Sequence, residues 1–499
     1  MPDPTPTHPH NTPPIPAPRP APGDSAAPLA TRHPSLNSPA LTAPTASHTA
    51  PQPPTVIAPH GGHPHPPTKL SRVVRVGTRI PPKPPRTRTR NRFRTQTRPR
   101  PHPHPQLLPA LRQSARHLDT VTPVSRDRAV DALRAIAILG VVLGHWLVTA
   151  LVAKDGGLHT TSPLQHMPQL APISWLFQTL AVFFLVGGHV ATRSLATARA
   201  RGDTYRSWLR ARLTRLLRPV AALLCLWAVT ATALLLTGTP LATTEALLKL
   251  ALSPLWFLLV FAGLTAATPL LTRLNPLWPL AVVLHVDLLR FGLHTGPSWL
   301  GWLNLPAGWL VPYTLGAAWT RGELDSRRAA RVLFLGGTAA TAVLIACAGY
   351  PASMVGVPGA RISNLDPPTL AAVTFGLAQC GLALLLRDRL RRAMARPLLW
   401  AAVALVNLSA MTIYLWHQTA MMATTATGLL AGRLPGLHTS PDSVGWVAYR
   451  LAWLPVFGLV LAVCRTAFRH HEQGPRRPRN RRSPVVRRHL PPAKKPRNA

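Results

Sequence analysis

Apolar stretches near the length of a membrane span recur along the chain from Ala129 onward, and short polar breaks separate them. About 20 apolar residues suffice for a helix to cross the hydrocarbon layer of a bilayer. The predicted spans cover residues 129–151, 174–192, 219–237, 254–271, 276–291, 304–320, 331–350, 369–386, 398–422 and 445–466. This pattern predicts an all-α, polytopic membrane domain with about ten transmembrane helices, bounded by residues 126–468.

The spans at 276–291 and 304–320 are the weakest, because charged or helix-breaking residues interrupt them. Asp287 and Arg290 lie inside the first of the two, and Pro occurs in both. Irregular backbone at membrane depth is tolerated only where protein or water satisfies its freed polar groups. We therefore expect these two spans to be tilted or broken.

Positive charge divides the loops between the spans into two alternating sets. The loops at 193–218, 272–275, 321–330 and 387–397 together hold 17 Lys and Arg residues, whereas the other set holds 4. Loops rich in Lys and Arg stay in the cytoplasm. The chain is therefore predicted to be a multi-pass protein of the cell membrane with both termini in the cytoplasm.

The two ends of the chain have the composition of disordered tails. Residues 1–125 are rich in Pro, Thr, His and Arg, and residues 469–499 carry 11 basic residues against 1 acidic residue. Such segments bury too little apolar surface to offset the entropy of ordering. Both are predicted to be disordered and cytoplasmic. Their charge favours anionic membrane lipids as a partner, and no specific nucleic acid is expected. The alternative is a solvated tail without a specific partner.

Arg134 and His145 place ionisable groups inside the first apolar span, where they are costly. Their spacing of 11 residues leaves them within about 20° on one helix face and roughly 16 Å apart along the axis. Asp131, three residues before Arg134, lies on the adjoining surface and can neutralise its guanidinium. The plain alternative is an Arg that snorkels to the cytoplasmic surface and a His that packs in an aqueous mouth.

The segment from Arg128 to His145 closely resembles the first helix of the acyltransferase 3 family, in which an Arg and a His separated by ten residues are the hallmark. Four further segments are similar to motifs of that family and follow in its order. They are Phe183 to Gly188 in the second helix, Arg212 to Pro219 at the start of the third, Pro254 to Leu258 in the fourth and Ser409 to His417 in the ninth. The second-helix motif differs at Gly187 and His189, where the family more often shows Ser-Gly followed by an aromatic residue.

The resemblance implies an integral-membrane acyltransferase. It would move an acyl group, acetyl in the simplest case, from cytoplasmic acyl-CoA to a hydroxyl of a glycan, a glycolipid or another acceptor, with acyl-CoA as a substrate and no permanently bound cofactor. His145 is the candidate catalytic residue, either as a general base toward the acceptor hydroxyl or as the carrier of the acyl group. Arg134 either positions the thiol end of the donor or forms a structural pair with Asp131.

Several other residues are candidates for binding the donor or the acceptor. The basic start of the third helix would attract the anionic pyrophosphate of acyl-CoA. Its arginines are Arg206, Arg210, Arg212, Arg215 and Arg218. His417 is expected either to line the acceptor cavity or to pack through an interhelical hydrogen bond. Trp256 and Tyr414 are candidates for stacking on a substrate, although Trp and Tyr in membrane helices more often lie at the membrane–water interface.

Other functions lack their sequence patterns. The four cysteines fall in four separate apolar spans without a Cys-x-x-Cys pair, so neither a disulfide framework nor a metal site is predicted. A membrane transporter or flippase is the alternative function, but an internal repeat between the halves, which such proteins often have, is not visible. The acceptor stays open between cell-wall glycan, glycolipid, exported oligosaccharide and secondary metabolite.

Overall fold

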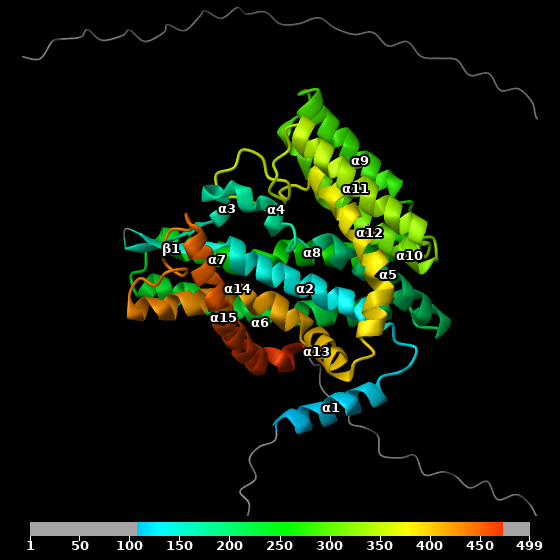
Figure 1. Ribbon diagram of the computed structural model, residues 1–499, viewed down its shortest axis with the longest axis horizontal. Helices are drawn as coiled ribbons and strands as arrows, with labels where there is room; N and C mark the ends of the chain where they lie inside the picture. The colour runs from blue at the N-terminus through cyan, green and yellow to red at the C-terminus, as the bar shows by residue number, and fades with distance from the viewer. Residues whose placement is uncertain (1–106, 155, 473–499) are drawn as a thin grey trace, which may run out of the picture. The chain divides into compact units, whose positions relative to one another are not determined.

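The computed structural model describes residues 107–154 and 156–472, which form a helical domain with one small β-hairpin (Figure 1). The first half contains α1 (Leu107–Val121), α2 (Arg128–Val148), β1 (Ala150–Lys154), β2 (Gly157–Thr161), α3 (Pro163–His166), α4 (Ala171–Ser174), α5 (Leu180–Ala200), α6 (Tyr205–Leu236), α7 (Leu241–Leu252) and α8 (Pro254–Leu271). The second half contains α9 (Leu277–Asp287), α10 (Asn304–Thr320), α11 (Arg327–Cys347), α12 (Leu370–Ala393), α13 (Pro397–Leu408), α14 (Ala410–Gly428) and α15 (Val444–Glu472). The predicted helical fold is confirmed, and the antiparallel hairpin of β1 and β2 is an addition to it.

Seven helical segments of the described chain are long and apolar enough to cross a membrane. They are Arg128–Val148, Leu180–Ala200, Tyr205–Leu236, Leu241–Leu271, Arg327–Cys347, Leu370–Ala393 and Val444–Phe468. An eighth is added if α13 and α14, which meet at an angle of 75°, form one broken span. The chain is therefore a multi-pass membrane protein. The single helix predicted over 398–422 is corrected to two helices that meet at Ser409.

The two weakest predicted spans are short helices in the structure. α9 has 11 residues and runs into a π-helix at Leu288–Gly292, and α10 has 17 residues, of which 13 are buried. Asp287, at the end of α9, accepts hydrogen bonds from the side chains of Asn304 and Tyr350 and from the backbone N–H of Leu370. Protein groups therefore satisfy this interrupted region, as a membrane interior requires.

The structure shortens both predicted tails. The prediction of disorder over residues 1–125 is wrong for Leu107–Val121, which form α1, and α15 continues to Glu472, past the predicted boundary at 468. Residues 1–106 and 473–499, which make up the rest of both tails, lie outside the described residues. Their predicted disorder and lipid binding therefore stay predictions.

α1 is held against α13 by apolar and polar contacts. Ala115 is buried, and the Trp400 indole of α13 donates a hydrogen bond to the hydroxyl of Thr122 just after α1. Asp119 forms an ion pair with Arg128 at 2.5 Å. Apolar residues of α1 recur at the three- and four-residue spacing of an amphipathic helix, a local pattern that the Pro-rich composition of the whole segment obscures.

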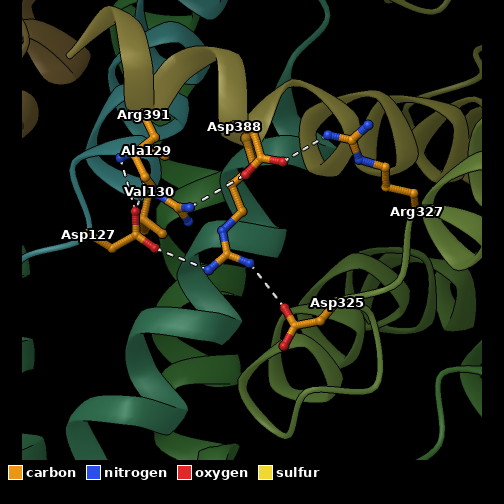
Figure 2. A network of polar contacts seen from close by, with 8 residues as sticks. Asp127, Ala129, Val130, Asp325, Arg327, Asp388 and Arg391 are labelled. Atoms are coloured by element: carbon orange, nitrogen blue, oxygen red, sulfur yellow. Dashed lines mark hydrogen bonds and ion pairs between the residues drawn. The ribbon is translucent and has the colours of Figure 1, made fainter. Parts of the chain in front are cut away.

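α2 lies among α5, α12, α13, α14 and α15, which all contact it (Figure 1). Its N-terminus is capped by Asp127, which accepts hydrogen bonds from the backbone N–H groups of Ala129 and Val130 (Figure 2). The same carboxylate pairs with Arg387 of α12 at 3.4 Å, and Arg387 also pairs with Asp325 at 3.0 Å. An ion-pair network therefore ties the start of α2 to α12.

α5 and α10 approach each other closely because glycines face the partner backbone. A Cβ atom on Gly188 would collide with the carbonyl group of Tyr313, and one on Gly316 would collide with that of Leu185. Small residues at such crossings let membrane helices pack backbone against backbone. The crossing therefore fixes α5 in the bundle.

Replacing Gly316 with Ala is expected to destabilise the folded protein by about 1–3 kcal/mol, the usual cost of overpacking a tight contact. The matched control is Gly336→Ala in α11, where open space surrounds the glycine. There the substitution should be neutral or stabilising, because Ala favours helix over Gly. Thermal unfolding of both variants in the same detergent measures the difference, and equal midpoints would contradict a tight crossing.

Candidate active site

Two cavities open along α2, one toward each end of the helix. The first, of about 560 Å³, is lined by His145 in the last turn of α2 and is called here the His145 cavity. The second, of about 410 Å³, is lined by Arg134 in the first half of α2 and is called the Arg134 cavity. The structure therefore places both hallmark residues on one helix but in different cavities, roughly 16 Å apart along the axis.

The lining of the His145 cavity combines aromatic rings with hydroxyl and carboxylate groups. The rings include Trp256, Phe257, Trp302 and Tyr414. The oxygen-bearing side chains include Thr160, Thr161, Ser162, Ser363 and Asp366. Ligand sites typically pair apolar and aromatic walls with a few polar groups that orient the ligand. This cavity therefore has the chemistry to hold a molecule with both hydroxyl groups and apolar faces.

His145 touches two buried polar side chains of α14. The Gln418 side-chain amide, which is fully buried, lies 3.0 Å from His145 Nδ1, and the His417 ring centroid lies 5.0 Å from that of His145. Gln418 Oε1 has no hydrogen-bond partner among the described residues. An amide presents a donor on one side and an acceptor on the other, so its rotamer selects which nitrogen of a neutral His145 carries the proton. In the structure Gln418 Nε2, a donor, faces Nδ1, so Nδ1 accepts and a neutral His145 carries its proton on Nε2. Turning the amide by 180° brings the unpartnered Oε1 to Nδ1–H, and the Nε2 lone pair is then free for chemistry.

His417 and Tyr414 occupy different positions around His145. His417 is fully buried and stands outside the cavity lining, with its Nδ1–H donating to the Tyr414 carbonyl at 2.6 Å. Its own carbonyl accepts from the Trp146 indole of α2 at 2.9 Å. The Tyr414 ring lines the cavity, and its hydroxyl donates to the Pro254 carbonyl at 3.0 Å. His417 therefore packs against the His145 ring without lining the cavity, whereas Tyr414 forms part of the cavity wall.

Arg450, on α15, fixes the end of α2 that carries His145. This side chain is 1% exposed, and the oxygen atoms that accept its hydrogen bonds are backbone carbonyls. Its guanidinium donates to the carbonyls of Trp146 at 2.7 Å, Thr149 at 2.7 Å and Gly436 at 3.0 Å. A cation is favourable at the C-terminal end of a helix dipole. Arg450 therefore positions the last turn of α2.

The Arg134 cavity gathers cationic side chains from α2 and α6. Arg212 and Arg215 line it together with Arg134, whereas Arg206, Arg210 and Arg218 stand outside its lining. The guanidinium carbon of Arg212 lies 5.2 Å from the centre of the Trp208 ring, which also lines the cavity. Arginines grouped in this way suit a phosphate-bearing ligand.

Asp131 lies outside the lining of both cavities. Its carboxylate accepts hydrogen bonds from the Arg126 guanidinium, with the Nε–Oδ2 distance at 2.6 Å, and its backbone carbonyl accepts from Asn407. Arg126 is thus a partner that the spacing of Asp131 and Arg134 did not indicate. Asp131 helps hold the first turns of α2.

Sequence reasoning missed Gln418 and Arg450, although each carries the signal that singled out His145. Both are polar residues inside predicted apolar spans, at 398–422 and 445–466. A polar or ionisable residue within a membrane span deserves a functional interpretation by default. Applied to every span, the same criterion would have included both residues.

Comparison with known proteins gives one family match. The family model described as an acyltransferase domain matches residues 127–468. The match begins at Asp127, the N-cap of α2, and ends within α15, so it contains both cavities. No curated protein and no solved structure matches the chain.

Arg450→Lys is expected to lower both stability and activity, because a lysine ammonium cannot reproduce the forked contact with several carbonyls. Losing one hydrogen bond to a charged group costs about 1.5–3 kcal/mol. The control is Arg433→Lys, an exposed position in the loop before α15. Thermal unfolding in detergent measures the effect. A midpoint equal to that of the control would show that Arg450 does not hold the end of α2.

Proposed function

The chain belongs to the acyltransferase 3 family and is a membrane-bound acyltransferase, and on that premise we propose that it moves an acyl group, acetyl in the simplest case, from cytoplasmic acyl-CoA to an acceptor hydroxyl held in the His145 cavity. The observation that carries this proposal is the contact between His145 Nδ1 and the buried Gln418 amide at the wall of that cavity. The contact engages Nδ1, and with the Gln418 amide turned so that its oxygen accepts from Nδ1–H, Nε2 is left unprotonated, which is the arrangement of a general base.

The proposed reaction is a single acyl transfer. The acceptor oxygen attacks the thioester carbon while His145 Nε2 takes the hydroxyl proton. The new carbon–oxygen bond forms as the carbon–sulfur bond breaks, and the proton passes from His145 to the departing thiolate of CoA. If His145 instead carries the acyl group, the same nitrogen attacks first and the acceptor hydroxyl follows in a second step.

The Arg134 cavity is the proposed site for the nucleotide end of the donor. Arg134, Arg212 and Arg215 supply positive charge for the pyrophosphate. The excess of basic residues in the loops on this side of the spans supports a cytoplasmic location for the cavity. Both termini would then lie in the cytoplasm as well. The role that we propose for Arg134 is to hold the donor.

A glycan or glycolipid is the acceptor class that the His145 cavity favours. Trp256 and Trp302 are 38% and 57% exposed and line the cavity, so their ring faces are available to a sugar. Hydroxyl groups and the Asp366 carboxylate in the same lining offer hydrogen bonds to sugar hydroxyls. These features support a polyhydroxylated acceptor.

His145→Ala should reduce acyl transfer by a factor of about 100 to 10,000, the usual loss when a general base is removed. The variant should still fold and insert, because Ala is favourable in a helix. The control is His166→Ala, an exposed position outside both cavities. Mass spectrometry of surface glycans and lipids from cells that carry each variant measures the acyl group gained. Wild-type acylation with His145→Ala would overturn the assignment.

Gln418→Glu should retain transfer and move the acid limb of the pH–rate profile to higher pH. A carboxylate beside Nδ1 favours protonation of the ring, so the base form is lost at a higher pH than in the wild type. Gln418→Met should lower the rate without that displacement, because it removes the group that selects the tautomer. Gln169→Glu, at an exposed position, is the charge control. An unmoved acid limb in Gln418→Glu would mean that Gln418 only packs.

A further inference from the structure

The two cavities are stacked along the same helices, and one layer of side chains separates them. In three of these helices, α5, α8 and α14, a residue in the lining of the His145 cavity lies three or four positions from a residue in the lining of the Arg134 cavity. The pairs are Leu180 and Phe183, Phe257 and Phe261, and Tyr414 and Met411. Such a spacing is about one helical turn, roughly 5.4 Å. The layer is therefore thin.

The centre of this layer is aromatic. Phe183, Phe257 and Phe261, called here the aromatic partition, have ring centroids 5.1 Å apart for Phe183 with Phe257 and 5.1 Å for Phe183 with Phe261. Phe257 and Phe261 are stacked at 6.4 Å. Gly187 leaves room for the Phe261 ring, since a Cβ atom there would collide with it. Rings held by such contacts can turn aside without breaking a hydrogen bond.

We propose that the aromatic partition is the gate through which the thioester arm of acyl-CoA passes from the Arg134 cavity to His145. The proposal rests on the proposed function, in which the nucleotide is held in one cavity and the hydroxyl acceptor in the other. The thioester must then cross the layer between them, and the partition has Phe257 in the lining of the His145 cavity and Phe183 and Phe261 in that of the Arg134 cavity. Closed rings keep water from the reactive carbonyl and seal the membrane when no donor is bound.

Cysteines placed in the two cavities can report separately where the pantetheine arm and the nucleotide of CoA bind. Ser194 lines the Arg134 cavity and Ser253 lines the His145 cavity. Each is changed to Cys in a background whose four native cysteines are replaced by Ser, and an impermeant methanethiosulfonate cation is applied to one face of sealed vesicles at a time. We expect each cysteine to react from one face only, and the two from opposite faces.

Free CoA tests whether the arm crosses the layer. Saturating CoA, added on the side of the Arg134 cavity, should slow the reaction of both Ser194→Cys and Ser253→Cys. An adenosine bisphosphate without the pantetheine arm should protect Ser194→Cys alone. Equal protection of Ser253→Cys by both compounds, or none by CoA, would overturn the gate.

Phe257→Ala tests the rings themselves. It should let the reagent reach both cysteines from either face, with the newly permitted reaction accelerated at least about tenfold, the change expected if the ring contributes 1.4 kcal/mol to closure. The control is Phe375→Ala, a partly buried ring that packs on Trp175 and lines neither cavity. Phe261→Leu, which removes less volume, replaces Phe257→Ala if that variant fails to insert. Labelling from one face only in the inserted variant would overturn the gate.

The gate and the proposed function fail in different ways. A wild-type protein that acylates its acceptor while CoA leaves Ser253→Cys unprotected retains the function and overturns the gate. A protein that releases no thiol from acetyl-CoA in membranes containing the acceptor refutes the proposed function directly, without any reference to the cysteine variants.

Discussion

The fold depends on α2 being fixed at both ends by charge. At its start Asp127 caps the helix and pairs with Arg387, and at its end the buried Arg450 guanidinium binds the carbonyls of Trp146 and Thr149. A carboxylate at the N-terminus and a cation at the C-terminus both complement the helix dipole. The Arg450 guanidinium is buried in protein, so these carbonyls, and not water, satisfy it. Because α2 carries a residue of each cavity, these end contacts also set the distance between the two cavities.

Most of the membrane fold follows from local sequence pattern. Spans such as 369–386 and 445–466 correspond to long helices because apolar length alone decides whether a segment can cross a bilayer. The break at Ser409 and the helix at Leu107–Val121 escaped prediction for a different reason. The bend between α13 and α14 is visible only in three dimensions, and α1 is stabilised by Trp400, far away in sequence.

Several residues that line the two cavities were named from the sequence, but their arrangement, Gln418 and Arg450 were not predicted. The spacing of Arg134 and His145 correctly placed them on one helix, yet their assignment to different cavities depends on which helices pack around each end. Asp131 forms an ion pair with Arg126, and His145 contacts the side chain of Gln418, which is 273 positions away. Such pairings arise from tertiary packing, and no periodicity in a single sequence encodes them.

The stacking of the two cavities has an electrical consequence under the proposed orientation. The highly charged nucleotide of the coenzyme would stay beside Arg134. Only the acyl group would be transferred permanently across the aromatic partition to the outer side. The proton removed from the acceptor hydroxyl at His145 returns inward with the thiol. An acylium equivalent therefore leaves as a proton enters, and no net charge is moved. Moving one charge across a membrane potential of 100 mV is worth about 2.3 kcal/mol. Under the proposed function, transfer to an acceptor on the outer side therefore neither draws on that potential nor opposes it.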